Sequence, residues 1–192
     1  MGKNLSLLPL SELWELFPIV IREHDPLWEE WYENESRLLA GLFPEETVRL
    51  SHIGSTSVRG LPAKPTVDIL LEIIPRCNLN RLGASLGQNG YIYSAQPGKP
   101  APHMMFMKGY TEQGFVPPVY HLHVRYPGDP DELYFRDYLR MHGDIALQYG
   151  MLKKRLAQKY EHDRDAYTEA KTEFIQKYTR AARREFPGRY QQ

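Results

Sequence analysis

Hydrophobic and polar positions follow two different periods along this chain, and the change of period divides it into two parts. From residue 25 to 43, apolar side chains recur at three- and four-residue spacing, which predicts a helix. Asp25 is suited to cap its N-terminus and Pro26 to occupy its first position. Short runs rich in Val, Ile and Leu follow at 46–53 and 66–74. The second run is apolar on both faces, which is typical of a central strand.

The remaining pattern predicts a helix at 79–86, ended by Gly87 or Gly90, and strands at 91–94, 103–108 and 119–126. Segments rich in Gly and Pro, at 96–102 and 114–118, are expected to be loops. Helical spacing returns at residue 131, and two sets of residues share one helical face each: Ile145, Tyr149, Leu152 and Leu156, then Tyr167, Ala170, Phe174, Tyr178 and Ala181.

These elements predict an α+β fold in which a mixed β-sheet is flanked by helices and the C-terminal third is helical. No internal repeat or low-complexity segment divides the chain. We therefore expect residues 1–192 to form a single domain. Its sheet core would span about residues 20–128 and its C-terminal helices about residues 129–186.

Composition narrows the classes of partner. Lys and Arg number 24, as do Asp and Glu, so the formal net charge is zero and no global field favours nucleic acid or membrane. No apolar run approaches the length of a membrane span, and the N-terminus lacks a basic region followed by a long apolar core. We expect a cytoplasmic protein that binds a small molecule. Any anionic ligand then needs a local cluster of positive charge.

The stretch HIGSTSVRGLPAKPTVDIL, residues 52–70, holds the first candidate chemistry. A strand that ends at Gly54 and opens into a polar turn can hold phosphate with backbone N–H groups and the hydroxyls of Ser55 and Thr56. Lys64 adds a positive charge. The following strand brings Asp68 to the same end of the sheet, where a carboxylate can hold Mg²⁺ against phosphate oxygens. The alternative is a polar turn in which the carboxylate caps neighbouring amides.

A pair of histidines is the second candidate. In YHLHVRY, His121 and His123 are two residues apart on a strand, so both rings project from one face. Such a pair can bind a divalent transition metal, or donate to phosphate when protonated. With Asp68, and with His52 joining from the strand before the turn, the set suits Zn, Mn or Fe better than Mg. The alternative is that both histidines are structural.

Two basic groups follow in the C-terminal third. In FRDYLR, Arg136 and Arg140 lie on one helix face, and they predict either anion recognition or a surface ion pair with Asp137. The run of Lys153, Lys154 and Arg155 is interpreted as a solvated helix face.

The stretch at 52–70 closely resembles the signature of the GrpB family, a branch of the nucleotidyltransferase-fold superfamily. IREHDPLWEEWY, YHLHVRY and FRDYLRMH resemble further parts of that family, in the expected order over residues 20–160. The resemblance implies a nucleotidyltransferase-like sheet. It also implies a nucleotide or phosphate-bearing ligand, bound with a divalent metal (Mg or Mn, with Zn as an alternative), and transfer of a nucleotidyl group to an acceptor. It also implies that Arg136 is an anion ligand and that Asp68 and Lys64 are the catalytic residues.

One departure from the superfamily pattern matters for catalysis. The pattern has two acidic residues separated by one apolar residue, and Leu70 occupies the second acidic position. Glu72 shares the face of Asp68 but its Cα lies roughly 13 Å farther along the strand. Arg59 stands where the family commonly has proline. The alternative function is therefore a catalytically inactive module that binds a nucleotide or a coenzyme A-related ligand, since the family also occurs fused to dephospho-coenzyme A kinase.

Overall fold

The computed structural model describes residues 9–191, so the N-terminal residues behind the export expectation lie outside it. Along the chain the elements are α1 (Leu10–Leu16), α2 (Leu27–Leu42), β1 (Thr47–Ile53), the 3₁₀ turn η2 (Ser55–Ser57), β2 (Val67–Ile73), α3 (Leu79–Gln88), β3 (Ile92–Ser94), β4 (Met104–Thr111), β5 (Gly114–Arg125), α4 (Asp131–Met141), α5 (Gly143–Lys159) and α6 (Arg164–Glu185). None of the helices between residues 9 and 191 combines the length and apolar character that a bilayer span requires.

The five strands form one mixed sheet in the order β1-β2-β5-β4-β3. β2 and β5 are parallel, whereas the other neighbouring pairs are antiparallel. This arrangement confirms the α+β fold with a mixed sheet and a helical C-terminal third. It also places the two parallel strands, which carry the acid and the histidine pair, side by side.

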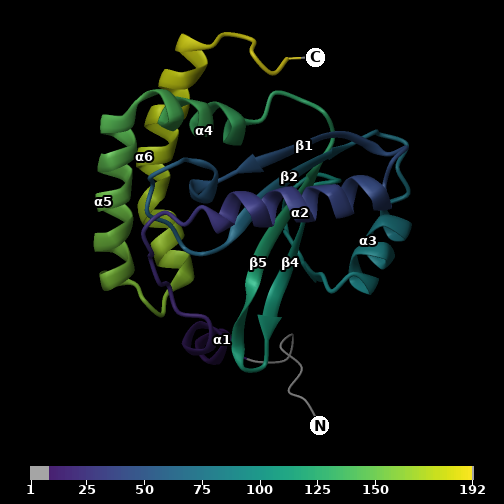
Figure 1. Cartoon of the computed structure of the whole chain (residues 1–192), viewed down its shortest axis with the longest axis horizontal. Helices are drawn as coiled ribbons and strands as arrows, with labels where there is room; N and C mark the ends of the chain where they lie inside the picture. The colour runs from purple at the N-terminus through teal and green to yellow at the C-terminus, as the bar shows by residue number, and fades with distance from the viewer. Residues whose placement is uncertain (1–8, 192) are drawn as a thin grey trace.

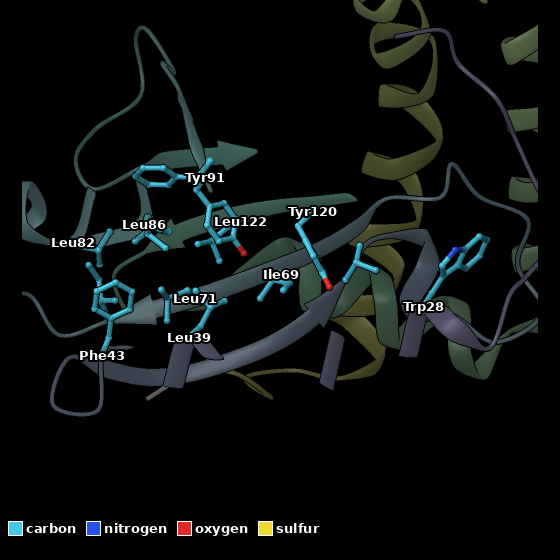
Figure 2. Packing of buried hydrophobic residues seen from close by; sticks show 14 of the residues in the cluster. Trp28, Leu39, Phe43, Ile69, Leu71, Leu82, Leu86, Tyr91, Tyr120 and Leu122 are labelled. Carbon is cyan, nitrogen blue, oxygen red and sulfur yellow. The ribbon is translucent and has the colours of Figure 1, made fainter. Parts of the chain in front are cut away.

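One face of the sheet packs against α2 and α3 and forms the largest hydrophobic core. Figure 1 shows α2 crossing in front of the strands. Figure 2 shows Ile69 and Leu71 of β2 beside Leu122 of β5, with Leu39 of α2 next to them. All four side chains are fully buried. Because side chains alternate along a strand, Asp68 and Leu70 project from the opposite face.

The opposite face is covered by the C-terminal helices. Leu70 of β2 packs with Ile53 of β1 and Leu133 of α4. Helices α5 and α6 lie side by side next to the sheet (Figure 1). Leu61, which follows η2, packs with Tyr149 of α5. The helical third therefore closes over the face that carries Asp68.

A local signal in the sequence accounts for the start of α2. The Asp25 carboxylate accepts a hydrogen bond from Leu27 N–H at 2.9 Å, as expected for a residue that caps α2. The expected loop at 114–118 is wrong, because this segment forms the first part of β5. Its prolines lie opposite Gly109, where the register with β4 shifts and φ is +86°. α1 was not predicted from the pattern.

Candidate functional site

Asp68 is held in the middle of the sheet between two partner strands. Its Cα pairs with Ile53 on β1 and with His121 on β5. Its Oδ1 atom lies 3.3 Å from His121 Nδ1 and 3.4 Å from His123 Nε2. The structure thus brings together the carboxylate and both imidazoles on the face covered by the C-terminal helices.

The hydrogen bonds around His121 favour one tautomer. Asp68 can only accept, so His121 Nδ1 carries the proton and Nε2 accepts from the Tyr110 hydroxyl, 2.6 Å away. Burial lowers the pKa of His121 to about 4, although the Asp68 carboxylate acts to raise it. Burial would raise the pKa of Asp68, but hydrogen bonds from the two imidazoles outweigh it and hold that pKa well below its usual range. At neutral pH the group is a carboxylate beside a neutral imidazole.

Gly54 lies directly against the carboxylate. Its φ of +69° and ψ of −172° belong to a region that is essentially restricted to glycine. A Cβ at this position would lie 2.3 Å from Asp68 Oδ2, which is far inside van der Waals contact. The Gly-Ser turn is therefore built around Asp68, and it places Ser55 at the mouth of the site.

The predicted residues Thr56 and His52 face a different environment. Ile53 pairs with Asp68, so the preceding residue His52 points to the α2 face, where its ring stacks on Tyr32 at 4.7 Å. The suggestion that His52 joins the histidine pair is wrong for this reason. The Thr56 hydroxyl lies 3.0 Å from His52 Nε2 and 3.3 Å from the Thr66 carbonyl oxygen, so it is engaged within the protein.

Three lysines converge beside Asp68 around a cavity of about 190 Å³, which we call the lysine cavity. Lys64 comes from the turn before β2, Lys153 from α5 and Lys171 from α6. Two tyrosines and the Asp68 carboxylate also line this cavity. The full set of lining residues is Gly54, Ser55, Thr56, Ala63, Lys64, Thr66, Asp68, His121, Tyr149, Lys153, Tyr167 and Lys171. Lys64 was predicted from the sequence as a ligand of the site, whereas Lys153 and Lys171 were not.

The prediction that residues 153–155 form a solvated helix face is wrong for Lys153. The basic run was interpreted as a solvated face, yet Lys153 is only 2% exposed, while Lys154 and Arg155 are exposed. The Lys153 ammonium donates to the Pro62 carbonyl and lies 4.8 Å from the centre of the Tyr149 ring. Its burial follows from the close docking of α5 on residues 61–62, where Gly150 leaves room for Pro62.

Desolvation and mutual repulsion destabilise the charged form of these lysines. Burial, followed by the Arg164 charge, lowers the pKa of Lys64 to about 8. Burial and the neighbouring Lys64 lower the pKa of Lys171 to about 7, and burial together with Lys171 lowers that of Lys153 well below its usual value. Within residues 9–191, the lysines that form ion pairs are Lys108 and Lys154, not these three. An anion in the cavity would relieve this repulsion.

A second cavity of about 390 Å³ adjoins the first, and we call it the Arg136 cavity. The two share Gly54, Ser55, Asp68 and Tyr149. The rest of its wall combines the apolar side chains of Ile53, Phe135, Leu139 and Ile175 with the polar or charged ones of His123, Asp131, Glu132, Arg136 and Thr179. A polar cavity joined to a larger, more apolar one can accommodate a molecule with a charged end and an apolar body.

The two arginines of α4 are already engaged. Arg136 donates to Asp137 at 2.8 Å, to the His52 carbonyl and to the Tyr190 hydroxyl, both at 3.1 Å. Arg140 donates twice to the Ser57 carbonyl, at 3.0 and 2.8 Å. Both guanidinium groups thus attach α4 to the end of β1 and to η2, and the ion-pair alternative describes the Arg136–Asp137 contact.

The acidic pair of the superfamily pattern has no counterpart in this geometry. Leu70 is fully buried, and the carboxylate of Glu72 accepts from Arg49 Nη2 at 2.8 Å and from Gly128 N–H at 3.3 Å. Between residues 9 and 191, no group of three or more His, Cys, Asp or Glu side chains is arranged to hold a metal ion. Asp68, His121 and His123 instead contact one another directly.

Comparisons with known proteins agree on one family. A family model described as GrpB protein matches residues 18–181. The UPF0157 protein YqkA of Bacillus subtilis is 31% identical over 186 residues, which cover 94% of this chain and 52% of YqkA. The UPF0157 protein PA4798 of Pseudomonas aeruginosa is 36% identical over 152 residues, 79% of this chain and 62% of PA4798. The chain thus spans between half and two thirds of the length of these two relatives.

A solved structure gives the same result. The crystal structure of the conserved protein GrpB from Enterococcus faecalis superposes with a TM-score of 0.76 and 31% sequence identity. The match covers 87% of this chain and 99% of that one. The structural similarity therefore extends over most of this chain.

Proposed function

The chain belongs to the GrpB family, and we propose that it binds a nucleotide or another phosphate-bearing small molecule at the face of Asp68. The observation that carries this proposal is the lysine cavity. Three lysines without a carboxylate ion-pair partner within residues 9–191 gather beside the Gly54–Ser55 turn. Phosphate groups would balance the excess of three lysines over the one Asp68 carboxylate in this cavity, and the Arg136 cavity has room for a base or another apolar part.

Among residues 9–191 no three His, Cys, Asp or Glu side chains are placed to hold a metal ion, so a divalent metal would bind here only by replacing the direct contacts among Asp68, His121 and His123. Asp68, His121 and His123 would hold it, and the mixed oxygen and nitrogen set suits Mn or Zn better than Mg. When bound, such an ion neutralises charge on phosphate oxygens and polarises the phosphorus centre. Ser55 and the backbone of Gly54 and Thr56 would contact the phosphates, with Lys64, Lys153 and Lys171 around them.

We further propose nucleotidyl transfer as the reaction to test. An acceptor oxygen would form a bond to the α-phosphorus while the bond to pyrophosphate breaks, and the acceptor proton would leave to solvent or a nearby base. The lysines would stabilise the departing pyrophosphate. A second candidate is a binding module without transfer. It is favoured by Leu70, which leaves one carboxylate where polymerase-like enzymes use two.

The binding test is calorimetry with ATP, GTP, CTP, UTP and tripolyphosphate, each with Mg²⁺, with Mn²⁺ and with EDTA. We expect Lys171→Gln to weaken binding at least tenfold because it removes a charge from the cavity wall. Lys177→Gln is the matched control, since this exposed lysine lies on the same helix outside the cavity. If none of these compounds binds, or if both variants bind as tightly as the wild type, the proposal is wrong.

The reaction is tested by pyrophosphate release from α-labelled nucleotides with a mixed acceptor pool. Turnover that is lost in Asp68→Asn supports transfer. Binding that persists in EDTA, without turnover under any condition, supports the binding module instead.

A further inference from the structure

A third cavity, of about 250 Å³, lies on the other side of Lys64 from the lysine cavity, and we call it the Arg164 cavity. It is enclosed by the segment between α1 and α2, the β4–β5 hairpin and the first residue of α6. Its wall is mainly apolar and aromatic, and the lining residues are Phe17, Pro18, Ile19, Val20, Arg22, Lys64, Pro65, Thr66, Tyr110, Phe115, Pro117, Val119 and Arg164.

The charges on this wall all have one sign. Arg22, Lys64 and Arg164 line the cavity, and its lining residues include no Asp or Glu. Within residues 9–191, the arginines that form ion pairs are Arg49, Arg136, Arg183 and Arg189, so Arg22 and Arg164 are without a carboxylate partner there. Apolar walls with unpaired guanidinium groups are complementary to a molecule that has an apolar body and an anionic head.

The position of these groups is fixed by neighbouring contacts. Arg22 and Ala63 exchange two backbone hydrogen bonds of 2.9 Å, which hold the segment before α2 against the turn that carries Lys64. Arg164 donates to the Tyr110 hydroxyl at 3.2 Å, and its guanidinium lies 5.7 Å from the centre of that ring. The cavity is therefore formed before any ligand binds.

Two connections join this cavity to the site of Asp68. Lys64 and Thr66 line both the Arg164 cavity and the lysine cavity, so the two share a wall. A polarised chain of contacts also runs between them. Arg164 donates to the Tyr110 oxygen, the Tyr110 hydroxyl donates to His121 Nε2, and His121 Nδ1 faces Asp68.

We propose that the Arg164 cavity is a second ligand site, which binds a small carboxylate or phosphate with an apolar or aromatic body next to the phosphate-bearing ligand. Its anionic head would contact Arg164 and Lys64, and its body would pack on Phe17, Phe115 and the neighbouring prolines. In a nucleotidyl transfer this second ligand would be the acceptor; that role rests on the proposed function, whereas the binding itself does not.

The test uses 3-phenylpropionate as the anionic probe, 3-phenylpropionamide as its neutral counterpart and 3-phenylpropyl phosphate as the phosphate form. Binding to the full chain is measured by calorimetry and by amide chemical shifts. We expect both anions to bind at least tenfold more tightly than the amide, and to shift amides of residues 17–22, 110, 115–119 and 164. The tighter of the two anions identifies the preferred head group.

Variants separate this site from the lysine cavity. Arg164→Gln should weaken 3-phenylpropionate at least tenfold, Arg164→Lys should restore most of the affinity, and Lys177→Gln should leave it unchanged. The proposal is overturned if the amide binds as tightly as the anions, if Arg164→Gln binds like the wild type while remaining folded, or if saturating tripolyphosphate displaces 3-phenylpropionate.

The outcome is distinguishable from failure of the proposed function. Binding of 3-phenylpropionate without any binding of nucleotides or tripolyphosphate supports the Arg164 cavity and rejects the phosphate-binding role of the lysine cavity. The reverse result supports the lysine cavity and rejects the second site.

Discussion

At the scale of single residues, Gly54 determines whether the turn and the carboxylate can coexist. Its backbone conformation is essentially restricted to glycine, and a Cβ would collide with Asp68 Oδ2. Gly54→Ala should lower the free energy of unfolding by about 1–3 kcal/mol through backbone strain. Displacement of Asp68 should also weaken binding of the phosphate ligand.

Denaturant unfolding and calorimetry measure these two effects. Gly41→Ala is the matched control, since Gly41 lies in α2 with open space around it. It should stabilise the protein by up to about 0.5–1 kcal/mol because alanine favours a helix. Equal effects of the two substitutions would contradict our account of the turn.

The lysine cavity should make both the stability and the ligand affinity of the protein depend on pH. Burial and neighbouring cations lower the pKa of Lys171 to about 7 and that of Lys64 to about 8, whereas unfolded lysines stay protonated to about pH 10. The unfolded state then holds more protons between pH 7 and 10, so the free energy of unfolding of the ligand-free protein rises with pH there. Affinity for tripolyphosphate falls over the same window, because the ammonium groups lose their charge.

Denaturant unfolding and calorimetry at pH 7 and 9 measure how the free energy of unfolding and the tripolyphosphate affinity change with pH. Lys171→Met should reduce both changes. Comparing it with the wild type cancels the titration of tripolyphosphate itself. A wild-type affinity that falls no more steeply than that of Lys171→Met would refute this explanation.

The site residues could be predicted from the sequence where a local pattern, such as strand alternation, determines their position. Alternation along a strand puts His121 and His123 on one face, and the adjacent strand carries Asp68. The burial of Lys153 depends on how α5 docks, which no local pattern reports. A usable signal was present, however: Tyr149 precedes Lys153 by four residues and Tyr167 precedes Lys171 by four, and each lysine lies over its tyrosine.

At the scale of elements, the strands predicted from apolar runs were found, while the extent of β5 was underestimated. Proline lacks the N–H that a ladder uses, so residues 114–118 read as a loop. In the structure Gly109 of β4 accommodates the prolines by a register shift, and this compensation comes from the partner strand. The position of His52 depends on the same kind of information, because register decides which face a residue occupies.

Arg49 of β1 and Glu72 of β2 are paired in the sheet and form an ion pair across the two strands. The Glu72 side chain is fully buried, and Arg49 is 23% exposed. Arg49→Met leaves the carboxylate without its cation and should cost about 3 kcal/mol of unfolding free energy. The double variant Arg49→Met with Glu72→Met should recover most of this loss, since a well-packed apolar pair removes the buried charge. Chemical denaturation of the three proteins measures it, and a double variant less stable than Arg49→Met would contradict the prediction.

At the scale of the whole molecule, the two faces of the sheet have different roles. The face under α2 and α3 is an apolar core, whereas the face under α4–α6 holds the charged site (Figure 1). The alternation of the strands predicts two faces, but the sequence does not reveal that α5 and α6 supply four of the twelve residues that line the lysine cavity, including two of its three lysines. Contacts between residues about 100 positions apart create it.

Ligand binding should therefore slow hydrogen exchange in distant parts of the chain. Tripolyphosphate at a hundred times its dissociation constant should slow exchange up to about 100-fold for amides of β2, α5 and α6 that open together with the cavity. Amides of α3 and β3, which do not line it, serve as the internal control. Protection confined to the turn at 54–57 would show that the C-terminal helices do not take part.

Burial and the neighbouring Lys64 charge lower the pKa of Lys171, and this has a consequence for chemical labelling. An amine with a pKa near 7 is about half unprotonated at neutral pH and acts as a nucleophile, unlike an ordinary surface amine. An activated ester added in limiting amount at pH 7 should acylate Lys171 ahead of the exposed Lys154 and Lys177, with peptide mass spectrometry as the readout. The candidate site would thus carry an amine that can be labelled covalently in preference to exposed lysines.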